Sequence, residues 1–166
     1  MTGTLVDEID WLEFIMVYTM DGDPNELTGT IPTQFGNLPN LILLDLDENA
    51  LTGTIPEEIF SATSLQQLDL DTNQLTGTIS TLLGSLLQLN FLQLFGNPIS
   101  GTFPNAELEN LTLMTTIGLD KMDLTGVVSE AVCDLPNLQN FWTDCNPIGN
   151  NPPQVVCDCC TFCSSG

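Results

Sequence analysis

Leucines and small polar residues recur along this chain at a fixed spacing. The letters LTGTIP occupy positions 27–32 and 51–56, LTGTIS occupies 75–80, and looser copies follow at 99–104 and 124–129. The starting positions of successive copies are therefore regular to within a single position. A pattern that returns at such a period predicts a solenoid, in which each turn buries its apolar side chains against the next turn.

Each period also carries a Leu-x-Leu pair, such as Leu68 and Leu70, which predicts a short parallel strand. Because side chains alternate along a strand, both leucines face inward and the residue between them faces outward. An asparagine follows the pair in most copies, and we expect its amide to lie inside and to satisfy backbone groups where the chain bends. These residues are Asn49, Asn73, Asn97 and Asn146. Met122 takes this position in the fifth copy, where we expect a local irregularity.

The repeats divide the chain into two parts. Residues 1–150 contain about six turns of leucine-rich repeats, and residues 151–166 leave the pattern. The letters MTGTLVDEI at 1–9 match LTGTIPEEI at 51–59, so the first copy begins in the middle of a repeat. A solenoid normally starts with a polar cap, and none is visible in the sequence. We therefore expect the chain to be a piece of a longer protein.

The 24-residue period with its LTGxIP signature resembles the leucine-rich-repeat family in its plant-type form. The resemblance covers essentially the whole chain and implies an α/β-type, β-rich solenoid: a right-handed superhelix with a parallel sheet on its concave side. Many members of this family carry a cysteine-rich C-terminal cap, which the segment at 151–166 resembles. In such a cap, Cys133 and Cys145 of the last repeat would anchor cysteines of the tail.

All six cysteines lie between position 133 and the C-terminal end, and this clustering predicts disulfide stapling of one end in an oxidising compartment. They are Cys133, Cys145, Cys157, Cys159, Cys160 and Cys163. Six cysteines allow 15 pairings, among which the sequence does not choose. Zinc binding is the alternative, although the chain has no histidine and lacks the usual paired CxxC spacing. The letters NLT at Asn110 form one N-glycosylation sequon, which is consistent with secretion.

The charge of the chain is extreme. Lys121 is the only basic residue against 22 acidic ones, which gives a formal net charge of −21. Nucleic acid and anionic membrane surfaces are therefore excluded as partners, whereas basic proteins, cations and neutral surfaces stay open. A simpler explanation is solubility in a salty medium. The sequence contains neither a membrane-spanning run nor a signal peptide, and we expect an extracellular or cell-surface protein.

Catalysis finds little support in the sequence. Without histidine, no Ser–His or Cys–His pair can form, and no glycine-rich phosphate loop or dinucleotide fingerprint is present. Carboxylate pairs are plentiful, but a solenoid offers an open surface where a dry pocket would be needed to raise the pKa of a catalytic acid. We expect a protein that is not an enzyme and needs no cofactor.

The outward positions of the predicted strands form a surface rich in carboxylates and aromatic rings. We predict that it is a concave recognition face for a protein or peptide, basic in character, with aromatic anchors. The predicted ligand-binding residues are Asp21, Asp45, Asp47, Asp69, Asp71, Phe91, Phe95, Asp120, Trp142 and Asp144. Calcium is a second use for the densest block, at Asp45, Asp47, Asp69 and Asp71. The aspartates of a purely structural scaffold would only solvate an exposed strand.

The two threonines of LTGTIP give an alternative surface. Stacked turns would align them in two flat, uncharged rows, which resemble the Thr-x-Thr faces of ice-binding solenoids; some plant leucine-rich-repeat proteins bind ice. Ice binding is therefore an alternative function, and recent duplication of the repeat explains the same regularity. The residues are Thr28, Thr30, Thr52, Thr54, Thr76, Thr78 and Thr102.

Overall fold

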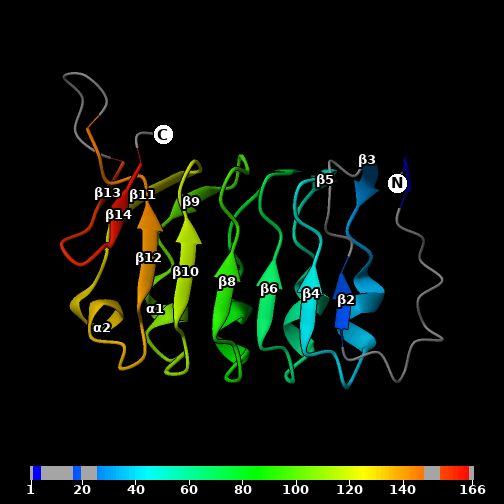
Figure 1. Cartoon of the computed structure of the whole chain (residues 1–166), viewed down its shortest axis with the longest axis horizontal. Helices are drawn as coiled ribbons and strands as arrows, with labels where there is room; N and C mark the ends of the chain where they lie inside the picture. Colours follow the sequence, from blue (N-terminus) through cyan, green and yellow to red (C-terminus); the bar gives the residue numbers. More distant parts are fainter. Residues whose placement is uncertain (1, 5–16, 20–25, 148–153, 165–166) are drawn as a thin grey trace.

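The computed structural model describes residues 2–4, 17–19, 26–147 and 154–164, and all its described strands pair in parallel. Seven strands, one from each turn, form the larger sheet (Figure 1). In chain order they are β2 (Val17–Thr19), β4 (Leu43–Asp45), β6 (Gln67–Asp69), β8 (Phe91–Gln93), β10 (Thr116–Leu119), β12 (Asn140–Thr143) and β14 (Phe162–Cys163). The side of this sheet that faces away from the core is called the open face below.

The LTGT segments form a second series of short strands. One group contains β1 (Thr2–Thr4), β3 (Glu26–Thr30), β5 (Ala50–Gly53) and β7 (Gln74–Leu75), and the other contains β9 (Ser100–Thr102), β11 (Asp123–Val127) and β13 (Val155–Val156). A single bridge between Thr78 and Ser100 joins the two groups. Each repeat therefore contributes two short strands, one to the larger sheet and one to the LTGT series.

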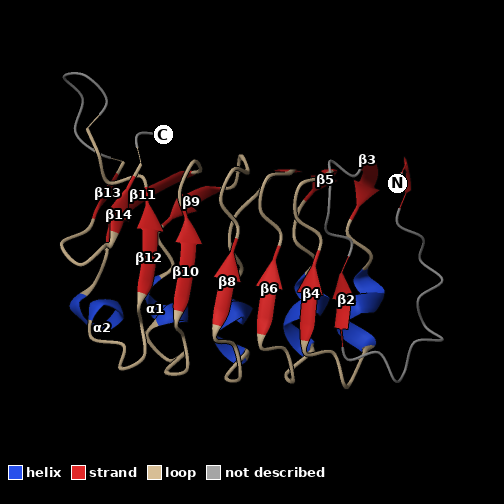
Figure 2. Ribbon diagram, in the orientation of Figure 1, coloured by secondary structure: helices blue, strands red, loops and turns tan. Residues whose placement is uncertain are grey.

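Short helices close each turn on the side opposite the open face (Figure 2). They are the 3-10 helices η1 (Thr33–Asn37), η2 (Glu57–Ser61) and η3 (Thr81–Ser85), followed by α1 (Asn105–Leu108) and α2 (Glu130–Cys133). Each buries one repeated apolar side chain, from Phe35 in η1 to Val132 in α2. Between helices and sheet lies one continuous core in which Leu44, Leu46 and Leu70 are fully buried, as the Leu-x-Leu pattern predicts.

The predicted asparagine ladder forms at three turns. Asn73 and Asn97 are buried, Asn49 is partly buried, and each accepts a hydrogen bond from the backbone N–H of a leucine in the preceding turn. The prediction is wrong for Asn146, which is exposed and donates to the carbonyl of Cys163. Asp144 takes its place, because its carboxylate accepts from the backbone N–H of Lys121 and of Met122. The backbone turn at Met122 is thus stabilised by a carboxylate of the following repeat.

The register differs between the two sets of strands. In the larger sheet Asp45 lies opposite Asp69, a step of one full period. In the LTGT strands Thr30 lies opposite Thr52 of the next turn, which is less than a full period away. The asparagine ladder explains the stagger, because each amide oxygen accepts from a leucine N–H that is also less than one period earlier, as Asn73 does from Leu51. The predicted alignment of Thr30 with Thr54, and of the remaining threonines in two straight rows, is therefore wrong.

Candidate functional site

The site begins with a row of residues that crosses the open face. Strand pairing places Asp45 opposite Asp69, Asp69 opposite Gln93, and Gln93 opposite Gly118. The same row continues from Gly118 to Trp142 and from Trp142 to Phe162 in the tail. The open face therefore has an acidic half at the earlier turns and an aromatic half at the later turns.

The acidic half brings three carboxylates together. Oxygen atoms of Asp45, Asp47 and Asp69 all lie within 4.8 Å of one another. The backbone N–H of Asp47 donates to Asp45 Oδ1 at 3.3 Å, and Gln93 Nε2 donates to Asp69 Oδ2 at 2.8 Å. Asp47 Oδ1 is shielded from solvent and accepts no hydrogen bond from the described residues. Such a cluster of hard oxygen atoms suits a cation, either a basic side chain or a calcium ion.

Burial and mutual repulsion raise the pKa values of these carboxyl groups. Burial, followed by the charges of Asp45 and Asp69, raises the pKa of Asp47 from 3.8 to about 6. Burial also raises the pKa of Asp69 to about 6, against the lowering effect of the hydrogen bond from Gln93. Burial raises the pKa of Asp71 as well. The cluster therefore becomes a stronger cation site as the pH rises above about 6.

These shifts predict that acidification stabilises the protein. Since the folded-state pKa values of Asp47 and Asp69 exceed the unfolded value, the folded chain binds more protons between about pH 4 and 6. We expect the thermal midpoint to rise by a few degrees from pH 7 to pH 5, measured by circular dichroism. Asp69→Asn should reduce this rise, whereas Asp123→Asn on the exposed surface should leave it unchanged. A midpoint that falls over this interval would contradict the prediction.

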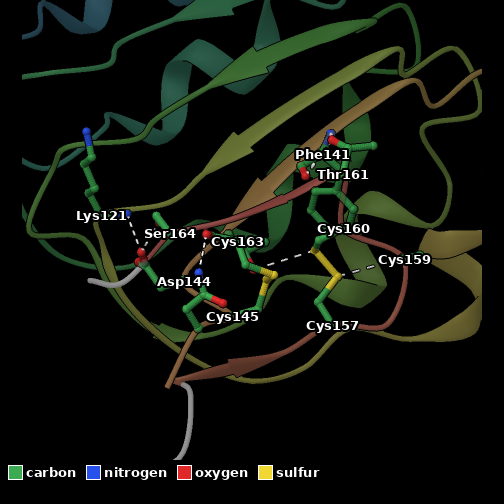
Figure 3. The surroundings of a disulfide bond; sticks show 12 residues. Lys121, Phe141, Asp144, Cys145, Cys157, Cys159, Cys160, Thr161, Cys163 and Ser164 are labelled. Carbon is green, nitrogen blue, oxygen red and sulfur yellow. Dashed lines mark hydrogen bonds between the residues drawn. A yellow bond between two sulfur atoms is a disulfide. The ribbon is translucent and has the colours of Figure 1, made fainter. Parts of the chain in front are cut away.

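The other carboxylates of the predicted site that the structure describes are largely buried. Asp71 and Asp120 are almost buried, with 5% and 9% of their surfaces exposed. Asp144 is also buried, and Figure 3 shows its carboxylate turned toward the backbone of Lys121 and the hydroxyl of Ser164. The expectation that Asp144 points outward is wrong, because the backbone at that turn needs its oxygens. Asp21 lies outside the described residues.

The aromatic half contains a hollow of about 320 Å³. The residues around it are Gln93, Phe95, Asp120, Trp142 and Phe162. Phe91 lies on the same face and is half-buried, but it does not line the hollow. Sequence reasoning missed Gln93 because it is uncharged, and it missed Phe162 because the tail lacks the repeat. The only signal for Phe162 was its place next to Cys163, which is tied to the last repeat.

The threonines of the LTGT segments interlock neighbouring turns. The hydroxyl groups of Thr52 and Thr76 donate to the carbonyl oxygens of Gly29 and Gly53 in the preceding turn. A methyl group added at Gly53, where φ is +80°, would lie 3.0 Å from Thr30 Cγ2, so this contact needs a glycine. A small β-branched residue at the second threonine position therefore has a packing role. Thr28, Thr54, Thr78 and Thr102 are exposed along the same edge.

All six cysteines form disulfides at the C-terminal end, as predicted. Cys133 pairs with Cys159, Cys145 with Cys163, and Cys157 with Cys160. The first two bonds join the tail to the last repeat, which is the anchoring that the family resemblance implied. Figure 3 shows Cys145 and Cys163 of the second bond. The tail also extends both sheets, because β13 pairs with β11 and β14 pairs with β12. The cap thus holds Phe162 beside Trp142.

Two further features bear on the predictions about glycosylation and membrane spans. Asn110 of the predicted sequon is exposed just after α1, and its Nδ2 donates to the carbonyl of Ala106 at 3.1 Å. Within the described ranges, no helix combines the length and the apolar character that a membrane crossing requires.

Two stacked parallel edges, an internal asparagine ladder and a disulfide-bonded end define a repeat solenoid whose side chains form an extended open face. A leucine rich repeat family model matches residues 23–75. Solved ectodomains of plant receptors match most of the chain. The chain is a leucine-rich-repeat solenoid of the plant type.

Three of these structures give the extent of the match. The ectodomain of the Arabidopsis thaliana receptor kinase GASSHO1/SCHENGEN3, in complex with CASPARIAN STRIP INTEGRITY FACTOR 2, is 25% identical with a TM-score of 0.81, over 94% of this chain and 19% of that chain. The plant peptide hormone receptor RGFR1, in complex with RGF2, is 32% identical with a TM-score of 0.79, over 87% and 23%. The ectodomain of the Arabidopsis thaliana receptor kinase SOBIR1 is 32% identical with a TM-score of 0.67, over 74% and 65%.

The chain thus spans about a fifth to a quarter of the first two receptor ectodomains, and just under two thirds of the third. No curated protein matches the chain by sequence.

Proposed function

We propose that this chain is a non-catalytic recognition module that binds a basic peptide or protein segment on its open face. The observation that carries the proposal is the cluster of Asp45, Asp47 and Asp69, whose oxygens lie within 4.8 Å of one another. The chain cannot neutralise its acidic residues from within, because Lys121 is its only basic residue. Burial, and after it repulsion between the carboxylates, raises the pKa values of Asp47 and Asp69, and a cationic ligand would relieve that repulsion.

The relatives support this class of function. Two of the similar structures are receptor ectodomains solved with their ligands, CASPARIAN STRIP INTEGRITY FACTOR 2 and RGF2, and the second of these receptors is a peptide hormone receptor. A solenoid binds along an extended face, so the ligand would contact several consecutive strands. The disulfides and the ectodomain relatives support an extracellular or cell-surface location.

Selection from a random peptide library tests the proposal. The immobilised full chain is expected to enrich peptides rich in lysine and arginine, and calorimetry then gives their affinities. The double variant Asp45→Asn with Asp69→Asn should weaken a selected peptide about tenfold or more, because the ligand loses two charges on its contact surface.

The matched control also removes two negative charges, but from exposed aspartates outside the cluster. Asp123 and Asp158 are both exposed and lie outside the cluster, so Asp123→Asn with Asp158→Asn should change the affinity less than twofold. Enrichment of neutral or acidic peptides, or equal losses in the two double variants, would refute the proposal.

Calcium binding is a second candidate function of the same cluster. Asp47 Oδ1 is shielded and has no donor among the described residues, and calcium takes carboxylate oxygens of this kind. Asp45, Asp47 and Asp69 would supply three of its six to eight oxygen ligands. Calcium titration by calorimetry tests this candidate. If calcium is the ligand, the full chain and the variant Asp123→Asn with Asp158→Asn should bind it, and the variant Asp45→Asn with Asp69→Asn should not.

A further inference from the structure

A glycine interrupts the row of side chains beside the hollow at the aromatic end of the open face. Gly118 lies between Gln93 and Trp142 in the sheet, and its neighbours in the row all carry long side chains. A methyl group added at Gly118 would lie 3.5 Å from Gln93 Cγ and 3.6 Å from Phe95 Cδ1. Both of those side chains line the hollow, so a side chain at Gly118 would project against its lining.

The walls of the hollow are three aromatic rings that come from different strands of the larger sheet or from the loop after one of them. Phe95 follows β8, Trp142 lies in β12, and Phe162 lies in β14 of the tail. The register partners Trp142 and Phe162 are adjacent, and Phe162 is 55% exposed, so its ring remains accessible. The faces of aromatic rings carry partial negative charge and attract cations.

Two further observations give the hollow its charge preference. Asp120 contributes a carboxyl group to its lining, and the whole chain carries a formal charge of −21. Lys121 Nζ lies 5.9 Å from the centroid of the Phe95 ring, which is within the range of a cation–π contact. Lys121 is exposed and does not line the hollow, so its own charge stays hydrated outside it.

We propose that this hollow binds one arginine side chain of the ligand, with the guanidinium group between the rings of Phe95, Trp142 and Phe162 and directed toward Asp120. The proposal rests on the function proposed above and assigns the aromatic half of the open face to one residue of a basic ligand. Arginine fits better than lysine, because its planar guanidinium stacks on rings and is less strongly hydrated. An uncharged apolar side chain would leave the Asp120 carboxyl group buried without a cation.

The test uses N-acetyl-L-arginine methylamide as the probe, with the full chain labelled for NMR. The chain has two tryptophans, so two indole N–H signals are expected, and Trp142→Phe assigns them. The arginine derivative should shift the Trp142 signal saturably. The citrulline derivative, which has nearly the same shape without the charge, and the norleucine derivative should both bind at least about fivefold more weakly. Equal affinity for arginine and citrulline would overturn the proposal.

Three variants locate the binding. Gly118→Leu fills the hollow and Phe162→Ala removes one wall, so each should weaken the arginine probe about fivefold or more. Leu87→Ala, at an exposed apolar side chain that does not line the hollow, should not change the affinity. Phe162→Ala changes an exposed ring, so it remains informative even where Gly118→Leu perturbs folding. Retained binding in Phe162→Ala would overturn the proposal.

The two proposals fail in different ways. If library-selected basic peptides lose affinity in Asp45→Asn with Asp69→Asn but not in Phe162→Ala, the recognition function stands and the arginine subsite is wrong. If selection yields no basic peptides while the arginine derivative still shifts Trp142, the recognition function fails and the subsite remains.

Discussion

Asn73→Ala is expected to lower the free energy of unfolding by about 3–5 kcal/mol, one of the two largest losses we predict. Asn73 Oδ1 accepts from the backbone N–H of Leu51 at 3.0 Å, and its Nδ2 donates to the carbonyl oxygens of Leu46, Leu70 and Asp71. Alanine removes all four hydrogen bonds. It also leaves a buried N–H group at Leu51 without its acceptor, which is the costliest single consequence.

The carbonyl groups are less affected than the N–H group. Leu46 O still accepts from Asn49 Nδ2, Leu70 O from Asn97 Nδ2, and Asp71 O from the backbone N–H of Glu48. This redundancy limits the loss to the range above. Urea denaturation followed by circular dichroism measures it, and Asn137→Ala is the control.

Asn137 is exposed and donates one hydrogen bond, to the carbonyl of Thr112 at 2.9 Å, so its loss should cost less than about 1 kcal/mol. Similar values for the two variants would show that the ladder does not support the stacking of the turns.

Removal of the Cys133–Cys159 disulfide by the double variant Cys133→Ser with Cys159→Ser is the second large effect. The two cysteines are 26 residues apart, and chain entropy predicts a loss of about 3.5 kcal/mol for a loop of that size. The bond also holds the tail, and with it Phe162, against the last repeat. We therefore expect both a lower free energy of unfolding and weaker binding of the arginine probe.

The Cys157–Cys160 disulfide is the natural control. Its cysteines are only three residues apart, so the same entropic argument gives about 2 kcal/mol for Cys157→Ser with Cys160→Ser. A larger loss in this variant than in Cys133→Ser with Cys159→Ser would contradict the assignment of the longer bond as the main anchor of the cap.

The sequence predicted the fold and one half of the site, because both depend on the repeat period. A step of one period places Asp45 beside Asp69, and the Leu-x-Leu pair fixes which residues face outward. The aromatic hollow depended on features without a period: a missing side chain at Gly118 and a ring donated by the tail at Phe162. Neither the letters of the repeat nor its spacing indicates them.

Two of the wrong predictions failed because hydrogen bonding shifted a segment or redirected a side chain. The threonines of the LTGT strands do not align in straight rows, since the asparagine ladder connects positions that are less than one period apart. Asp144 stands in the outward column of aspartates but turns inward, where its carboxylate accepts from the backbone N–H groups of Lys121 and Met122. In both cases the hydrogen-bonding needs of the backbone decided the final position.

The tail has a consequence beyond its disulfides. An unfinished stack of parallel strands is a template to which another polypeptide can add by backbone pairing. Here the last strands of both series, β13 and β14, are only two residues long, and Cys163 of β14 is tied through sulfur to Cys145 beside β12. Edges this short give an incoming chain few backbone groups to pair with, so β13 and β14 themselves are poor templates for fibre-like growth.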